Sequence, residues 1–288
     1  SHAASFATPT EEQAELIATI RRFVEREVVP VASRHDHDDT YPHELVARMR
    51  ELGLFGATIP TEYGGLGLDV TTYAMLIEEL CVGWMSLSGI LNTHLLLAYM
   101  IRTQGTEEQK RRYLPKMATG EWIGSFALTE PQSGSDAAGL QTRAERRGDG
   151  YVVTGRKIFI TNAPRAHHFV TFARTAAGIS AFIIDADSPG VSIGQVFDTT
   201  GHRGSQISEV IFEEARIPAE ALIGEEGKGM DYAKRCLSEG RTTLSARCVG
   251  TAQKALELAV EHAEQRRTFG KPLAEHQALA FRLAQMSA

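Results

Sequence analysis

Apolar residues recur at helical spacing through roughly the first 120 positions of the chain. Between Leu16 and Val24 they fall every three or four positions on one face, and Thr10 with Gln13 forms a capping box just ahead of them. Asp69 is a suitable N-cap for a later apolar run. The pattern predicts an N-terminal set of helices near residues 11–24, 42–52, 70–80, 86–102 and 106–117.

The periodicity changes after Gly120. Short segments rich in β-branched and aromatic residues follow, and clusters of Gly, Pro or Asp, such as Arg147–Gly150, separate them. The segments cover residues 151–160, 168–173, 179–185 and 209–212. This pattern predicts a compact antiparallel β domain, either a barrel or a sandwich.

From about Lys228 the pattern is helical again, and it predicts two long helices over residues 230–249 and 252–267. Helices, then strands, then helices are typical of an α+β multidomain chain rather than of alternating βαβ units. We expect an all-helical N-terminal domain (residues 1–122), a middle β domain (123–227) and the start of a C-terminal helical bundle (228–288). Because the helical pattern reaches Ala288 without a stop signal, we expect that bundle to be incomplete and the chain to be C-terminally truncated.

Charge and hydropathy exclude several classes of function. The 288 residues carry 30 Lys and Arg against 36 Asp and Glu, a net charge of −6, whereas a nucleic-acid-binding surface usually carries a basic excess. Residues 1–9 lack the basic-then-apolar pattern of a signal peptide, and the most apolar stretch, Ile90–Ile101, is too short to cross a bilayer. We predict a cytoplasmic protein that binds neither nucleic acid nor membrane.

Cysteine and histidine positions do not predict a metal site. Cys81, Cys236 and Cys248 are widely spaced, and each lies in a mostly apolar helical stretch, so we expect three buried free thiols. His35 and His37, with neighbouring aspartates, occupy near-consecutive positions at a helix end and do not converge on one ion. We interpret that segment as a solvated turn.

The segment Thr129–Asp136 has the composition of a ligand-binding loop. Small residues and Gly134 allow backbone N–H groups to approach a ligand, and Thr129 and Ser135 add hydroxyl groups. The alternative is a Ser/Gly-rich surface turn, which composition alone favours. The segment has neither the spacing of a dinucleotide fingerprint nor the Gly-Lys-Ser/Thr of a nucleotide-phosphate loop.

The stretch Ala127–Gly139 resembles the first signature of the acyl-CoA dehydrogenase family at every constrained position. Three further motifs resemble that family in the same order: Gly155–Asn162, Gly201–Ser205 followed by Val210–Pro218, and Arg266–Gln277. The similarity is in register from about Glu11 to the last residue. The chain therefore looks like an FAD-dependent acyl-CoA dehydrogenase.

The resemblance implies a set of FAD contacts. Leu128 and Thr129 would bond the polar edge of the flavin ring, Phe159 would cover one ring face, and Thr161 would reach the flavin N5, where hydride arrives. The implied cofactor-binding residues are Phe126, Leu128, Thr129, Gly134, Ser135, Phe159, Ile160, Thr161, Arg266, Thr268, Phe269 and Gln277. Because the last four would contact FAD bound mainly by another subunit, the resemblance also implies a homo-oligomer, either a dimer or a tetramer.

The implied reaction is α,β-dehydrogenation of an acyl-CoA thioester to the 2-enoyl-CoA, as in fatty acid metabolism, with electrons passed to an electron-transferring flavoprotein. A glutamate would remove the α-proton. In most of the family this glutamate lies beyond the position of Ala288, so the catalytic residue stays unassigned. Isovaleryl-type enzymes place it at Gly240; Glu239 is adjacent but about 100° away around a helix, and we interpret it as a surface or ion-pairing residue.

Ser135 and Arg241 match positions that the family uses near the substrate, whereas Ser238 stands where many members have Asp on the CoA side. His94 lies in an apolar helix, and we interpret it as a hydrogen-bonded core histidine; the alternative is that it lines the acyl cavity. The length and branching of the acyl chain do not follow from the sequence.

Two other functions remain open. The same scaffold carries flavin-dependent monooxygenases and acyl-CoA oxidases, which react with oxygen instead of an electron-transfer protein. It also carries non-catalytic flavoprotein homologues that act as binding modules, including a DNA-binding alkylation-response type. The net charge of −6 disfavours DNA binding.

Overall fold

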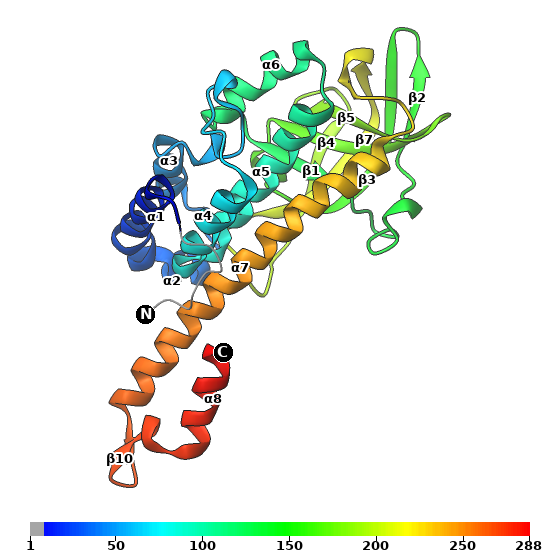
Figure 1. The fold of residues 1–288 in the computed structure, drawn as a ribbon. Coiled ribbons are helices and arrows are strands. Elements are labelled where there is room, and N and C mark those ends of the chain that lie inside the picture. The colour runs from blue at the N-terminus through cyan, green and yellow to red at the C-terminus, as the bar shows by residue number, and fades with distance from the viewer. Residues whose placement is uncertain (1–8) are drawn as a thin grey trace.

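The computed structural model describes residues 9–288; most of the segment that lacks a signal-peptide pattern, residues 1–8, lies outside the described residues. Helices from both ends of the chain pack on one mixed β sheet, and one long helix runs along the whole molecule (Figure 1). Within residues 9–288 no helix combines the length and hydropathy that a membrane span needs.

The N-terminal helices are α1 (Glu11–Phe23), α2 (Val29–Asp38), α3 (His43–Glu51), α4 (Val70–Gly83), α5 (Met85–Gln104) and α6 (Glu107–Ala118). Five of them form where the apolar pattern predicts them, whereas α2 was not predicted. Thr10 and Gln13 form the expected capping box, and the Asp69 carboxylate accepts the N–H of Thr72 at 2.7 Å. Helix α5 has buried residues along its whole length, because the other helices and the sheet surround it.

The strands of the middle part of the chain form one eight-stranded sheet with the order β6-β7-β3-β2-β4-β5-β8 and with β1 paired to β4. Their bounds are β1 Gly124–Ala127, β2 Arg143–Arg147, β3 Gly150–Thr161, β4 His168–Thr175, β5 Gly178–Asp185, β6 Val191–Val196, β7 Ile207–Pro218 and β8 Leu222–Ile223. The four predicted strands are confirmed, as β3, β4, β5 and β7. Strand β2 went unpredicted because its sequence, Arg-Ala-Glu-Arg-Arg, is charged and only Ala144 is buried.

The prediction of a purely antiparallel barrel or sandwich needs correction. Strands β1 and β2 both pair with β4 in parallel, and the path of paired strands ends at β6 and β8 without closing. Parallel neighbours are joined by long connections. Here the connection between β1 and β4 is 40 residues long (128–167) and contains the loop after β1 and the β2–β3 hairpin. Strand propensity is local and does not specify such a partner.

The two faces of the sheet belong to two hydrophobic cores. In β5, Ile179, Ala181 and Ile183 face the core shared with the helices, whereas Phe182 and Ile184 face the core of the β domain itself. This alternation follows from the two-residue period of a strand. The helical core therefore extends into the middle domain and fixes the sheet against α5.

The two C-terminal helices predicted from the sequence form one helix, α7 (Gly229–Gln265), and that prediction is wrong. Gly250 lies between the two predicted helices, inside α7 where α7 crosses α4: a Cβ on Gly250 would lie 2.1 Å from the carbonyl oxygen of Glu78. The glycine serves close packing rather than helix termination. Beyond α7 a short hairpin, β9 (Arg267–Thr268) and β10 (Lys271–Pro272), leads into α8 (Gln277–Ser287).

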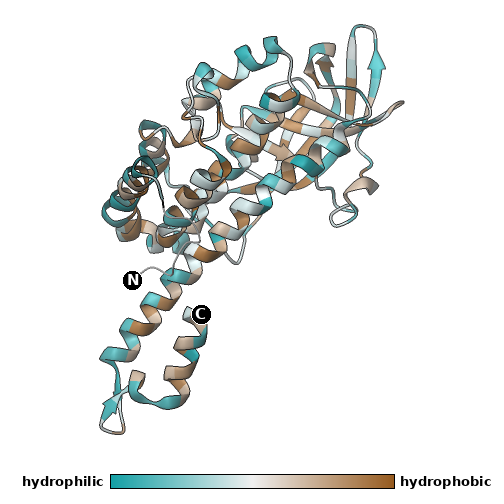
Figure 2. Cartoon of the chain, in the orientation of Figure 1, coloured by the Kyte–Doolittle hydropathy of each residue, from teal (hydrophilic) through white to brown (hydrophobic). Residues whose placement is uncertain are grey.

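The distal half of α7, the hairpin and α8 project from the rest of the protein (Figure 1). Apolar residues continue along these helices (Figure 2) and several are exposed, namely Val249, Leu258, Leu279, Phe281 and Met286. Cys81 and Cys236 are buried free thiols as predicted, but Cys248 is exposed. The prediction for Cys248 is wrong because its side of α7 is not covered by any other element of residues 9–288.

Candidate functional site

The loop that follows β1 and the end of β3 lie side by side. The backbone N–H of Ile158 donates to the Thr129 carbonyl at 2.9 Å, and the Ser125 hydroxyl donates to the Thr161 carbonyl at 2.6 Å. These bonds bring residues 126–129 next to residues 159–161, two groups that the sequence predicted to share one flavin ring.

A buried ion pair holds this arrangement together. Lys157 on β3 is fully buried, and its ammonium group donates to the Glu130 carboxylate at 2.8 Å, to the Phe172 carbonyl at 2.7 Å and to the Leu128 carbonyl at 3.2 Å. An ammonium has three protons, so all of its donors have acceptors. Lys157 thereby joins β3, β4 and the loop at one point.

The Glu130 carboxylate, only 2% exposed, organises the other side of the loop. Besides Lys157 it accepts the backbone N–H groups of Gln141 at 2.6 Å and Thr142 at 2.9 Å, and the side-chain amide of Gln132 at 2.6 Å. Burial alone would raise the pKa of Glu130, but the ammonium and these donors outweigh it and lower the pKa to about 2. Burial lowers the pKa of Lys157 to about 8 against the opposing effect of Glu130. Both groups are therefore charged at neutral pH.

Phe159 presents an aromatic face to solvent. It is 59% exposed, its φ of 59° lies in the left-handed region, and its ring centroid is 5.0 Å from that of Phe197. The cause is a bulge in β3: the pairing with β7 shifts register between Lys157 and Ile160. A non-glycine residue at positive φ costs of order 1 kcal/mol and is concentrated at functional sites. The bulge turns Phe159 out of the sheet while Ile160 stays in the core of the β domain.

The other predicted contacts differ in what they offer a ligand. The side chain of Ile160 is 2% exposed, so only its backbone is available. Phe126 is half-buried with its ring centroid 5.1 Å from that of Phe172, and Leu128 is buried. Within residues 9–288 the N–H of Thr129 has no backbone acceptor, and Gly134 and Ser135 are exposed. An open N–H donor beside an exposed aromatic ring fits the edge and face of a flavin.

The predicted contacts at the end of the chain lie elsewhere. Arg266 and Gln277 are exposed, Phe269 is 97% exposed, and Thr268 lies 3.2 Å from His276 in the projecting hairpin. Figure 1 shows this hairpin at the tip of α7, away from the sheet. One chain thus does not bring these residues to the loop after β1, and their role toward FAD held by another subunit stays a prediction.

The middle of α7 faces α5 across a cavity of only about 10 Å³, which holds one water at most. Glu239 lines it and lies 3.5 Å from the Arg102 guanidinium, which confirms its interpretation as an ion-pairing residue. A Cβ on Gly240 would lie 3.2 Å from the side chain of Leu96. Arg241, the predicted substrate contact, is exposed.

His94 is a core residue, as interpreted. It is fully buried, Nδ1 accepts the N–H of Gly124 at 3.0 Å, and Nε2 lies 3.1 Å from the carbonyls of Phe55 and Met117. Burial lowers its pKa to about 4, so the ring is neutral and Nε2 carries the proton. His94 fastens α5 to the start of β1.

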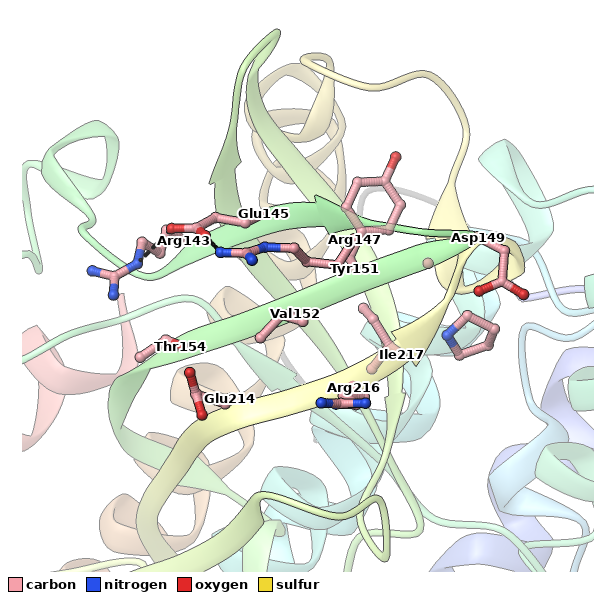
Figure 3. A pocket seen from close by; sticks show the side chains of 12 residues that line it. Arg143, Glu145, Arg147, Asp149, Tyr151, Val152, Thr154, Glu214, Arg216 and Ile217 are labelled. Carbon is pink, nitrogen blue, oxygen red and sulfur yellow. Dashed lines mark hydrogen bonds and ion pairs between the residues drawn. The ribbon is translucent and has the colours of Figure 1, made fainter.

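A groove of about 720 Å³ on the outer face of β2, β3 and β7 is a separate feature (Figure 3). The carboxylate of Glu145 pairs there with Arg143 at 3.1 Å and Arg147 at 3.0 Å. None of the predicted flavin contacts lines this groove. Its charges largely compensate one another, and it gives no support to a catalytic role.

Comparison with known proteins shows the family of the chain. Models of the acyl-CoA dehydrogenase N-terminal, middle and C-terminal domains match residues 10–121, 125–215 and 227–288. The chain is 40% identical to an acyl-CoA dehydrogenase of Bacillus subtilis over 284 residues, which are 96% of this chain and 75% of that protein. The chain belongs to the acyl-CoA dehydrogenase family. A short-chain specific acyl-CoA dehydrogenase of Clostridium acetobutylicum is 41% identical over 283 residues, again 96% of this chain and 75% of that protein.

Solved structures superpose on this family member with high TM-scores. Butyryl-CoA dehydrogenase from Megasphaera elsdenii gives 0.94 at 37% identity over 98% of this chain and 76% of that chain. A structure concerning the electron transferring flavoprotein of Acidaminococcus fermentans gives a TM-score of 0.94 at 38% identity over 99% of this chain and 76% of that chain. Glutaryl-CoA dehydrogenase from Mycobacterium smegmatis with FADH2 gives a TM-score of 0.92 at 31% identity over 97% of this chain and 72% of that chain. The prolyl acyl carrier protein oxidase AnaB gives a TM-score of 0.92 at 30% identity over 97% of this chain and 76% of that chain.

Sequence reasoning assigned no role to three residues that position the site of this acyl-CoA dehydrogenase family member. Lys157 and Glu130 form the buried pair, and the Asn162 amide donates to the Ile90 carbonyl at 2.8 Å, tying the end of β3 to α5. All three lie within the motifs that carry the resemblance. A lysine at a strand position whose neighbours predict burial was the available signal, because a buried lysine requires an anionic partner.

Proposed function

We propose that this protein catalyses FAD-dependent α,β-dehydrogenation of an acyl-CoA thioester to the 2-enoyl-CoA and passes the electrons to an electron-transferring flavoprotein. The observation that carries the proposal is the open edge made by the Thr129 N–H and the exposed Phe159 ring in a member of the acyl-CoA dehydrogenase family. The FADH2 complex of a related glutaryl-CoA dehydrogenase supports FAD as the cofactor.

Bound FAD would supply the hydride acceptor. Phe159 would stack on the ring and the N–H groups of Leu128 and Thr129 would bond its polar edge, while the backbone of Ile160 and Thr161 would complete the side formed by β3. Gly134 would let the loop approach the cofactor, since no atom lies within 4 Å of the position that its Cβ would take. Ser135 and Arg241, both exposed, would contact the acyl-CoA.

We propose a homo-oligomer in which Arg266, Thr268, Phe269 and Gln277 of one subunit contact FAD held by another. The exposed apolar residues on α7 and α8 support an interface there, since large exposed apolar patches mark association surfaces. We also keep the domain boundaries 1–122, 123–227 and 228–288, because the elements change type between α6 and β1 and between β8 and α7.

We propose a short acyl chain as the substrate. Support comes from the tight packing of α5 against α7 around Gly240, where the free space is about 10 Å³, and from the short-chain specificity named for the Clostridium relative. Glu239 is not proposed as the base, because its carboxylate pairs with Arg102. A Glu239→Gln variant that retains the deuterium exchange of substrate α-protons would agree with this assignment.

The test is an anaerobic assay of the purified full-length protein with FAD and a series of saturated acyl-CoA esters. Bleaching of the flavin absorbance and formation of 2-enoyl-CoA, greatest with the shortest esters, are expected. Bleaching is expected to be followed by transfer of electrons to added electron-transferring flavoprotein. Absence of bound FAD, or of any bleaching by acyl-CoA, would refute the proposal.

An acyl oxidase is the second candidate, because the oxidase AnaB shares this fold at 30% identity. The two functions differ in how fast the reduced flavin reacts with oxygen. Stopped-flow mixing of substrate-reduced protein with air-saturated buffer separates them: reoxidation within a single turnover time favours the oxidase, and slow reoxidation favours the dehydrogenase.

A further inference from the structure

We propose that Lys157 is a positioning residue for the flavin, acting through the peptide group between Leu128 and Thr129. The inference rests on the proposed function, since it concerns how this chain would tune the FAD that it binds. The ammonium of Lys157 orients that peptide and strengthens its N–H as a hydrogen-bond donor, so that the protein binds reduced FAD more tightly than oxidised FAD.

The geometry connects the two ends of one amide. The carbonyl oxygen of Leu128 accepts from the Lys157 ammonium at 3.2 Å, and the N–H of the same peptide group is that of Thr129. Among residues 9–288 this N–H has no backbone acceptor, whereas the Thr129 carbonyl is bonded to Ile158. Within residues 9–288 the Thr129 N–H is therefore a donor without a backbone acceptor, and it is polarised from the other end of its peptide group.

The surroundings make the polarisation strong. Lys157 is fully buried, so water does not screen its charge, and a charged donor to a carbonyl forms a stronger hydrogen bond than a neutral one. Hydrogen bonds in a chain polarise one another, and withdrawal of electron density at the carbonyl makes the attached N–H a better donor. A better donor at the polar edge of the ring favours the electron-rich, reduced ring over the oxidised one.

The pair is built so that the charge stays in place at neutral pH. Glu130 neutralises it at 2.8 Å, and the Phe172 carbonyl accepts the remaining proton at 2.7 Å, so the ammonium has one orientation. The pKa of Lys157, about 8, leaves the group mostly protonated at pH 7. An apolar residue could fill the same space, but it could not act on the Leu128 carbonyl.

The experiment separates this electrostatic role from structural support. Lys157→Met keeps the unbranched stem and removes the charge. Lys157→Met combined with Glu130→Gln removes both charges, so that no unpaired carboxylate is left, while the amide oxygen still accepts a backbone N–H from residues 141–142. Phe182→Leu is the matched control, because Phe182 is fully buried in the β domain core on β5, away from the loop. The free energy of unfolding, the FAD dissociation constants of both redox states and the midpoint potential of bound FAD are measured for each purified full-chain protein.

We expect both lysine variants to lose about tenfold of the preference for reduced over oxidised FAD, which for a two-electron couple lowers the midpoint potential by about 30 mV. Stability is expected to recover in the double variant while the potential stays low, and Phe182→Leu should lose stability without a change in potential. If the potential recovers with stability in the double variant, or is unchanged in both, Lys157 is only structural and the inference is wrong. A wild-type protein that binds no FAD would instead refute the proposed function, and the inference with it.

Discussion

Removal of the Lys157 charge should also change how the free energy of unfolding of the protein depends on pH. The relevant group is the partner carboxylate of Glu130, whose pKa is about 2 in the folded protein and 4.5 without its surroundings. A difference of 2.5 pKa units corresponds to about 3 kcal/mol of folding free energy at neutral pH. Because the folded pKa is the lower one, this contribution is present above pH 4.5 and is lost as the pH falls toward 2.

In Lys157→Met the carboxylate keeps its N–H donors but has no cation, and burial then raises its pKa. Breaking a buried pair by removing one partner costs about 3–5 kcal/mol, so we expect the variant to be less stable than wild type by about that amount at pH 7. At pH 3.5 the wild type has lost about 1.4 kcal/mol of the Glu130 contribution, whereas the variant, in which the pKa of Glu130 is raised, loses none of it. The gap between the two proteins should therefore narrow by at least about 1.4 kcal/mol between pH 7 and pH 3.5.

The assay is urea unfolding followed by circular dichroism at several pH values. Protein and FAD concentrations are held constant, because ligand binding and subunit association both shift apparent stability. Arg21→Met is the control: the Arg21–Glu79 pair at 2.8 Å is partly exposed, so its loss should cost less than about 1 kcal/mol. A stability gap for Lys157→Met below 1 kcal/mol at pH 7, or one that stays constant down to pH 3.5, would refute the reasoning.

Three further variants test other parts of the fold and site. Phe159→Ala should weaken FAD binding about tenfold, because the aromatic stacking face is lost, and the stability of the protein should stay within about 0.5 kcal/mol of wild type. FAD binding is measured by calorimetry, and Val196→Ala, at another exposed strand position, is the control. Gly250→Ala should lower stability by about 1–3 kcal/mol, because its Cβ meets the Glu78 carbonyl at 2.1 Å, whereas Gly201→Ala, with open space around it, should melt like wild type. His94→Gln should remove up to about 3 kcal/mol of the stability that the wild type loses as the pH falls from 6.5 to 4, because the folded pKa of His94 is the lower one. An unchanged pH profile in urea titrations would contradict the burial argument.

Much of the fold could be predicted because its causes are local. Helix α1 begins at a capping box made by Thr10 and Gln13, and strands such as β5 are predicted by their β-branched and aromatic residues. The predictions that failed depended on contacts with distant segments. Gly250 lies between the two predicted helices but packs against α4 inside one continuous helix, and the exposure of Cys248 depends on which side of α7 is covered.

The candidate site shows the same division. The loop Thr129–Asp136 and the stretch Gly155–Asn162 carry recognisable residues in a recognisable order, so the kind of cofactor could be predicted from them. The bulge that turns Phe159 outward could not be predicted, because it arises from a register shift between β3 and β7. The projection of Arg266 and Phe269 away from the sheet likewise depends on the uninterrupted length of α7.

The sequence by itself determined the order of helices and strands, the family and the residues around the flavin loop. Only the tertiary structure decided that β1 and β2 both pair in parallel with β4, and that Lys157 meets Glu130 and the Leu128 carbonyl in the core. The physical reason is the distance along the sequence over which each kind of interaction acts. Capping and periodicity act over a few residues, whereas a buried charge finds its partner only after long loops have closed and water has been excluded.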